Sequence, residues 1–184
     1  SRKAKIESCW LNMELPIINN EMTNFFSSYR SDYPTAIAII HGNKDNPSIR
    51  GEVLFYQLDD GVYIKAYIIG IPDTNSKGEP TKFHGFHIHE RGDCTIDKSE
   101  DPFPSVGSHF NPNNNIHPFH SGDLPPILSA NGIGILSVFT NSFRVIDILE
   151  RSIILHEDRD DFTSQPSGMS GKKIACGVIL PYHY

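Results

Sequence analysis

Residues 35–69, TAIAIIHGNKDNPSIRGEVLFYQLDDGVYIKAYII, decide the fold class of this chain. The segment holds three strand-length runs rich in isoleucine, valine and aromatic side chains, and clusters of Gly, Asn, Asp and Pro separate them. Such runs between turn-forming residues predict β-strands rather than helices. The predicted strands are Thr35–His41, Gly51–Gln57 and Gly61–Ile69.

Five further runs continue this pattern toward the C-terminus. They are Phe83–His89, Gly132–Thr140, Ser142–Ile148, Ser152–His156 and Lys173–Leu180. Eight short strands with few helical stretches and no repeat predict an all-β, eight-stranded antiparallel barrel or sandwich. Two connections, residues 90–131 and 157–172, are far longer than a hairpin needs. Long loops in a compact domain are usually functional, so we expect the active site there.

Length and composition indicate one soluble globular domain of residues 33–184, preceded by an N-terminal extension of residues 1–32 that has no sustained period. No apolar run approaches the roughly 20 residues of a membrane span. The formal net charge of −6 argues against nucleic-acid binding. The first thirty residues lack the apolar stretch of a signal peptide, which predicts a cytoplasmic location. Because the chain begins at Ser1, an extracytoplasmic location after leader removal stays open.

Histidine is the residue type that points to function. His87 and His89 lie two apart in GFHIHE, within a predicted strand. Side chains alternate between the faces of a strand, so both imidazoles are expected on the same side. His84, in the same strand, is expected to be a hydrogen-bonded structural histidine. An H-x-H pair alone is a weak signal, and the other histidine motifs give it weight.

A second group lies in the long loop after this strand. His109 in GSHFNP is followed by His117, His120 and Asp123 in HPFHSGD. Three imidazole nitrogens and one carboxylate oxygen are the closed tetrahedral set of a structural zinc site. His156 ends a late strand, and carboxylates follow it. An all-histidine set with an open position suits copper, so the sequence predicts two different metal sites.

The five motifs GFHIHE, GSHFNP, HSGDLPPI, LHEDRDD and SGKKIACGVI, in this order, resemble the copper,zinc superoxide dismutase family from about Tyr33 to the C-terminus. The forms GDC at residues 92–94 and SQPSGMSGKKIACGVI resemble the bacterial-type branch, and a viral or microbial member fits the composition. The resemblance implies a Greek-key β-barrel. It also implies superoxide as the substrate and copper and zinc as cofactors.

The resemblance also implies roles for individual residues. Copper is expected on His87, His89, His109 and His156. Zinc is expected on His109, His117, His120 and Asp123. His109 would therefore bridge both ions, and Asp160 would link a copper ligand to a zinc ligand. Of the three cysteines, Cys94 and Cys176 would form a disulfide, which leaves Cys9 unpaired.

The implied reaction converts superoxide to O2 and hydrogen peroxide, as copper alternates between Cu(II) and Cu(I) and His109 holds and returns a proton. Lys173 stands where the family has an arginine that guides superoxide to copper. Lysine keeps the charge but loses the planar fork of donors, so we expect activity reduced several-fold but retained. Lys172 and Arg159 are further candidates for a positive patch. The short interval between His117 and His120 indicates a shortened zinc loop.

Two other functions compete with an active enzyme. One is a catalytically weak or inactive relative that acts as a copper-binding or decoy protein, and the other is a copper-only relative. The complete ligand set favours the enzyme. A homodimer is one expectation for assembly, dependence on a copper chaperone is left open, and a viral member would work in the host cytoplasm or the virion.

Overall fold

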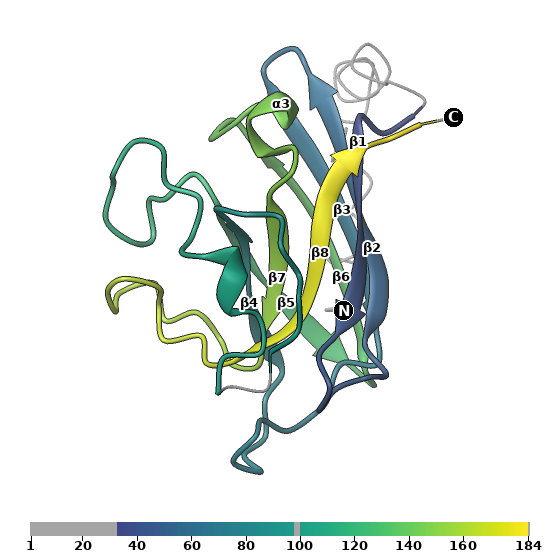
Figure 1. Ribbon diagram of the computed structural model, residues 1–184, viewed down its shortest axis with the longest axis vertical. Coiled ribbons are helices and arrows are strands. Elements are labelled where there is room, and N and C mark those ends of the chain that lie inside the picture. The colour runs from purple at the N-terminus through teal and green to yellow at the C-terminus, as the bar shows by residue number, and fades with distance from the viewer. Residues whose placement is uncertain (1–32, 98–99, 184) are drawn as a thin grey trace, which may run out of the picture. The chain divides into compact units, whose positions relative to one another are not determined.

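The computed structural model describes residues 33–97 and 100–183; the predicted extension, residues 1–32, lies outside them. Eight strands form a closed barrel in the order β1-β2-β3-β6-β5-β4-β7-β8 (Figure 1), which confirms the all-β prediction. All neighbouring strands are antiparallel, and the β3–β6 and β4–β7 pairs are the crossovers of a Greek key. The strands are β1 Ala36–Gly42, β2 Arg50–Leu58, β3 Gly61–Ile69, β4 Phe83–His89, β5 Asp123–Ala130, β6 Ile133–Thr140, β7 Ser152–His156 and β8 Lys173–Pro181.

Alternating burial explains the first three strands. In β3, Val62, Ile64, Ala66 and Ile68 are buried, and the residues between them face outward or lie half-buried. Because side chains alternate between the two faces of a strand, every second side chain of β3 points into the barrel interior. The interior is filled mainly by isoleucine, valine and phenylalanine side chains. Within the described residues, no helix is long and apolar enough to cross a membrane.

The predicted strand Ser142–Ile148 is wrong. The structure has a short helix there, α3 (Val145–Ile148), and the backbone N–H of Arg144 donates to the Asp147 carboxylate at its start, at 2.8 Å. Val145 and Ile148 are buried, so the apolar residues that suggested a strand are helical contacts with the barrel.

The eighth strand is instead β5, which lies within residues 90–131, the segment predicted to be one long loop. Pro125 and Pro126 obscured it, because proline cannot donate to a strand ladder. β5 pairs with β4, but with β6 through only two residue pairs, Ser129–Gly134 and Ala130–Ile133. The first long connection is therefore residues 90–122, which contains the 3-10 turn η1 (Pro104–Val106).

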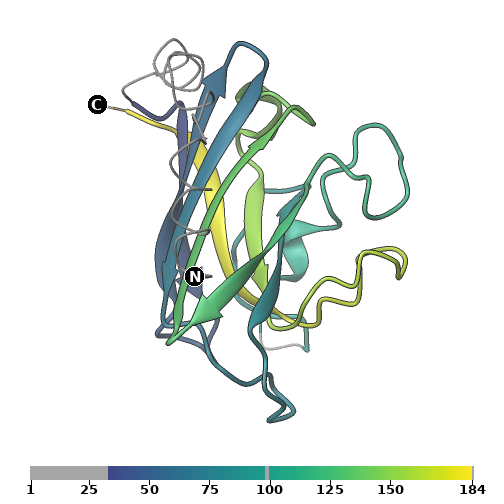
Figure 2. The ribbon, with the colours of Figure 1, turned by 180° about the vertical axis from the view of Figure 1, so that it is seen from behind.

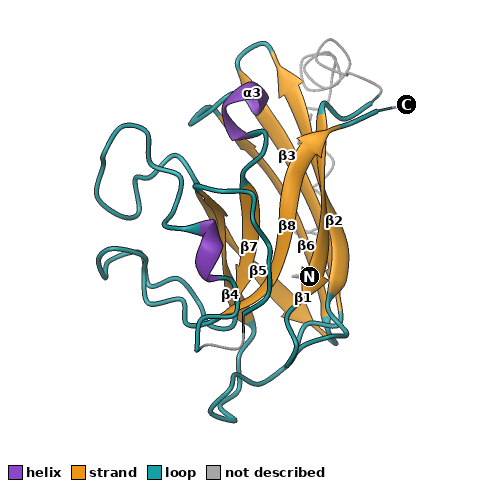
Figure 3. Ribbon diagram, in the orientation of Figure 1, coloured by secondary structure: helices purple, strands orange, loops and turns teal. Residues whose placement is uncertain are grey.

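A second, smaller core lies outside the barrel. Phe103 and Val106 of the first long connection pack on Ile154 of β7 and Cys176 of β8. The predicted disulfide between Cys94 and Cys176 is confirmed, and its Cα atoms are 5.7 Å apart. Both long connections lie on the same side of the barrel, beside β4 and β7 (Figures 1 and 2). Almost all of this side is loop rather than regular structure (Figure 3).

Candidate metal centre

The structure brings all seven predicted metal ligands together. Among the described residues, two groups place one ligand atom per residue within 4.8 Å of one another. The first group is His87, His89, His109 and His156, and the second is His109, His117, His120 and Asp123. His109 belongs to both groups, and its ring centroid is 4.1 Å from that of His87.

Strand pairing explains how the four-histidine group assembles. Phe86 and Ile88 of β4 belong to the barrel core, so His87 and His89 face outward beneath the long connections. In the neighbouring strand β7, Ile154 is paired with His87, and His156 follows two residues later on the same face. The prediction that the H-x-H pair shares one face is thus consistent with the burial of its neighbours.

Hydrogen bonds fix the orientation of these rings. The His87 Nε2–H donates to Asp160 at 2.7 Å, and the His89 Nδ1–H donates to the Gly107 carbonyl at 2.8 Å. The His156 Nδ1–H donates to the Gly171 carbonyl at 3.3 Å. An imidazole that donates through one nitrogen keeps a lone pair on the other, and metal-binding histidines are usually held in this way.

The opposite ring nitrogens are the strongest sign of a metal. Six buried ring nitrogens in the described part of the chain have no hydrogen-bond partner. Leaving a buried polar atom unpaired costs about 1–3 kcal/mol, so six at one place require another explanation. Bound metal would satisfy all of them. The atoms are His87 Nδ1, His89 Nε2, His109 Nε2, His117 Nδ1, His120 Nδ1 and His156 Nε2.

The second group surrounds the Asp123 carboxylate. His109 Nδ1 lies 2.7 Å from one carboxylate oxygen, while His117 Nδ1 and His120 Nδ1 lie 3.0 and 3.3 Å from the other. The last two contacts lack hydrogen-bond geometry despite these distances. Two ligand atoms each about 2.0 Å from a tetrahedral zinc are about 3.3 Å apart. The spacing therefore fits atoms that share one ion better than atoms that bond to each other.

The protonation states also suit metal binding. Burial lowers the pKa of His87 to about 4, and burial followed by the charges of neighbouring histidines lowers those of His89 and His156 well below the usual value. These imidazoles are neutral at pH 7, as ligands must be. Burial alone would raise the pKa of Asp123, but its hydrogen bond to His109 and the three nearby imidazoles lower it, so the carboxylate is ionised.

Asp160 lies between the two groups. Its carboxylate accepts hydrogen bonds from His87 Nε2 at 2.7 Å, His117 Nε2 at 2.9 Å and the Phe162 backbone N–H at 2.7 Å. Burial opposes ionisation, but these three donors hold the pKa of Asp160 well below its usual range. Gly168, at φ +72°, packs directly against Asp160 and His117. A Cβ at this position would lie 2.0 Å from Asp160 Oδ1, so only glycine fits without a shift.

Gln165 is a residue that the sequence interpretation missed. Its Oε1 accepts from the His117 backbone N–H at 3.0 Å, and its Nε2 donates to the His117 carbonyl at 2.7 Å. The second long connection thereby holds both backbone polar groups of a predicted zinc ligand. No local sequence signal marks a contact between residues 48 positions apart.

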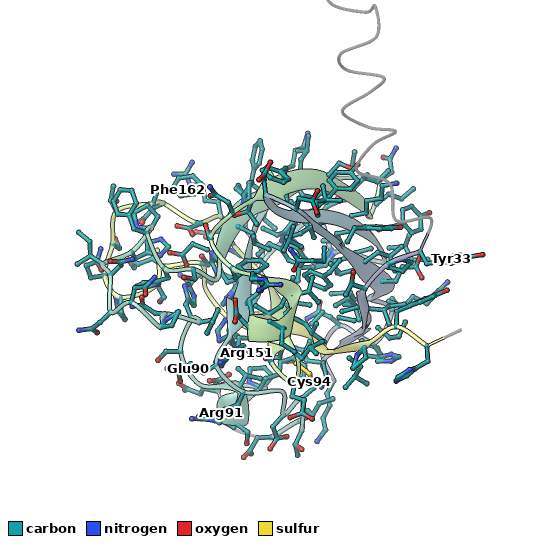
Figure 4. The ribbon with its side chains drawn as sticks, turned by 90° about the horizontal axis from the view of Figure 1, so that it is seen from above. Tyr33, Glu90, Arg91, Cys94, Arg151 and Phe162 are labelled. Atoms are coloured by element: carbon teal, nitrogen blue, oxygen red, sulfur yellow. A yellow bond between two sulfur atoms is a disulfide. The ribbon has the colours of Figure 1, made fainter. Side chains whose placement is uncertain are left out.

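The first long connection is fixed at its start as well as by the disulfide. Arg151 donates to the Glu90 carbonyl at 2.7 Å, and its guanidinium lies 4.0 Å from the Phe110 ring centroid. The Glu90 carboxylate accepts from the Ser108 backbone N–H at 3.1 Å. Figure 4 labels Glu90, Arg151 and Cys94, which lie on the same part of the molecule. These contacts hold the segment that carries Gly107 and His109.

An open cleft of about 820 Å³ leads to the metal centre. His89, His109, His120 and His156 line it, together with residues of both long connections. Histidines outside the two groups behave differently: His84 has both ring nitrogens paired, with the His156 carbonyl at 3.0 Å and the Ser129 hydroxyl at 3.2 Å. The structural role expected for His84 is confirmed.

Two of the three residues predicted to form a positive patch line the cleft, and the third does not. Lys172 and Lys173 line the cleft, whereas Arg159 is exposed and is not part of its lining. The Lys173 ammonium forms an ion pair with Asp101 at 2.5 Å, a partner that the sequence did not indicate. The cleft therefore has cationic side chains near the metal centre, but one of them is paired.

Similarity to known proteins agrees with this geometry. Residues 49–179 match the family described as copper/zinc superoxide dismutase. The chain is 36% identical to an extracellular superoxide dismutase [Cu-Zn] of Drosophila melanogaster, over 78% of this chain and 83% of that protein. It is 33% identical to the superoxide dismutase [Cu-Zn] of Paramecium bursaria Chlorella virus 1, over 86% and 84% of the two chains.

The fold recurs in a solved structure. The Cu/Zn superoxide dismutase from Brucella abortus superposes with a TM-score of 0.65 over 78% of this chain and 98% of that one, at 24% identity. That family uses copper and zinc, and the two ligand groups of this chain have the donor types those ions prefer. On sequence and fold together, the chain belongs to the copper/zinc superoxide dismutase family.

Proposed function

We propose that this protein is a superoxide dismutase that converts two superoxide anions and two protons to O2 and hydrogen peroxide. One observation carries the proposal: six unpaired, buried ring nitrogens gather in two groups that share His109. A structural core would not keep such atoms unpaired. The open cleft beside them gives a small anion access to the centre.

The two groups suit different ions. The four-histidine group would hold copper through His87, His89, His109 and His156. The group with a carboxylate would hold zinc through His109, His117, His120 and Asp123, a closed tetrahedral set. Copper supplies one-electron exchange in both directions, and zinc has no redox chemistry of its own.

The protein's own residues handle the proton and the substrate. His109 Nε2 is the atom that we propose holds a proton and returns it to reduced superoxide, while His109 Nδ1 stays at the Asp123 side. Lys173 lines the same cleft as His89, His109 and His156, so it is the residue that we propose attracts the anion, to the extent that its ion pair with Asp101 leaves its charge uncompensated. Asp160 keeps His87 and His117 in position through both Nε2 atoms.

The direct test measures superoxide consumption by protein loaded with copper and zinc, with metal-free protein as the blank. His89→Ala should abolish most of the rate, because it removes a proposed copper ligand. His41→Ala is the matched control, since His41 is exposed and outside both groups. A negligible rate at full copper occupancy would refute the proposal.

That negative result would favour the second candidate, a weak or inactive relative that binds copper without rapid turnover. The ion pair between Lys173 and Asp101 is the observation that favours it, since it reduces the positive charge available in the cleft. The homodimer and the cytoplasmic location stay predictions, and dependence on a copper chaperone stays open. The relatives include proteins named as extracellular and as viral.

A further inference from the structure

The Lys173–Asp101 pair stands at the entrance to the proposed copper group. Lys173 is the first residue of β8, and it lies opposite His156 of β7 in the strand register. Its side chain is 15% exposed, whereas that of Asp101 is 43% exposed. Both residues line the cleft, and the carboxylate is the more exposed member of the pair.

Carboxylates outnumber ammonium groups among the described side chains that line the cleft. Of the described residues that line it, Lys172 and Lys173 are the basic side chains other than histidine. Four carboxylates oppose them. They are Glu90, Glu100, Asp101 and Glu157. Asp101 is the one of these carboxylates that forms an ion pair with Lys173, and the interaction of two charges is strongest at contact distance.

We propose that Asp101 determines how strongly the cleft attracts anions, by cancelling the charge of Lys173. This inference rests on the proposed function for the identity of the substrate, but it applies to any small anion that reaches bound copper. Asp101 is a positioning residue in this scheme, because it acts through Lys173 rather than on the reacting atoms. The native protein is then an enzyme with a reduced attraction for superoxide.

Asp101→Asn isolates this effect. Asparagine has nearly the same shape, and its Oδ1 can still accept from the Phe103 backbone N–H, a bond of 3.1 Å in the native structure. The variant removes one negative charge from the cleft and leaves the Lys173 ammonium uncompensated. One elementary charge acting over roughly 10 Å of water changes anion attraction by about twofold at low ionic strength. The Debye length is about 3 Å at 1 M salt, so the difference should vanish there.

The first measurement is the azide dissociation constant of the copper- and zinc-loaded protein, followed through the visible absorption of copper. The second is the superoxide rate of the same samples across a salt series. Asp101→Asn should tighten azide binding and raise the low-salt rate, each about twofold. Lys173→Gln should change both by a similar factor in the opposite direction. The double variant should return close to the native azide affinity.

Glu52→Gln provides the control for net charge. It makes the same charge change at an exposed position of β2 that does not line the cleft, and it should leave both readouts unchanged. Equal effects from Glu52→Gln and Asp101→Asn, or no effect from Asp101→Asn, would overturn the inference. If azide affinity responds as expected but no variant consumes superoxide, the proposed function fails and the inference about anion attraction stands.

Discussion

The disulfide gives a prediction whose size follows from the structure. Cys94 and Cys176 are 82 positions apart, so the bond closes a large loop in the unfolded chain. The chain-entropy relation assigns about 4.5 kcal/mol at 25 °C to a loop of this length. For a chain of this size each kcal/mol corresponds to roughly 2–4 °C, so reduction should lower the Tm by about 9–18 °C.

The measurements are thermal and urea unfolding of metal-free protein, oxidised and reduced, both followed by far-UV circular dichroism. A Cys9→Ser background prevents thiol exchange with the third cysteine. Cys94→Ser, at a half-buried position, should match the reduced protein. The m-value should show whether the reduced chain still unfolds in one transition. A loss below about 1 kcal/mol would refute the reasoning, because the smaller core of Phe103, Val106 and Ile154 would then hold the connection alone.

Three other predictions concern protons and zinc. Metal-free protein should lose stability, measured by urea titrations, as pH falls from about 6.5 toward 4. The pKa of His87 is about 4 in the folded protein, below its value in the unfolded chain. The unfolded chain therefore binds more protons in that pH window, and falling pH favours unfolding. A pH-independent stability there would contradict this. Asp160→Ala should weaken zinc binding about 10–100-fold in chelator competition, because it removes the acceptor for His117, and unchanged affinity would exclude that role. Gln165→Ala should weaken zinc binding more than copper binding, with Gln165→Glu intermediate because it keeps only the acceptor; equal losses for both metals would indicate general loosening.

The sequence predicts most of the metal centre because metal chemistry restricts it. Only a few residue types bind copper or zinc, and their spacing along strands and loops is visible without coordinates. All seven predicted ligands accordingly lie in the two groups. Asp101 and Gln165 escaped notice, because their partners are 72 and 48 positions away and a lone Asp or Gln in a loop has no distinguishing pattern.

The two errors in the predicted fold also arose where local sequence does not identify the structure. Residues 142–148 have the composition of a strand, but the Asp147 carboxylate satisfies a backbone N–H at the start of a helical turn. Short apolar runs do not distinguish strand from helix by periodicity alone. β5 was hidden by its two prolines, and it is held in the barrel mainly by β4 rather than by a continuous ladder on both sides.

The shared residues of the two groups have a thermodynamic consequence. His109 belongs to both, and Asp160 is hydrogen-bonded to one histidine of each. A metal that ordered either group would thus prepare ligands of the other, so we expect the two binding equilibria to be coupled. Coupling of this kind is reciprocal: whatever factor zinc contributes to copper affinity, copper must contribute to zinc affinity.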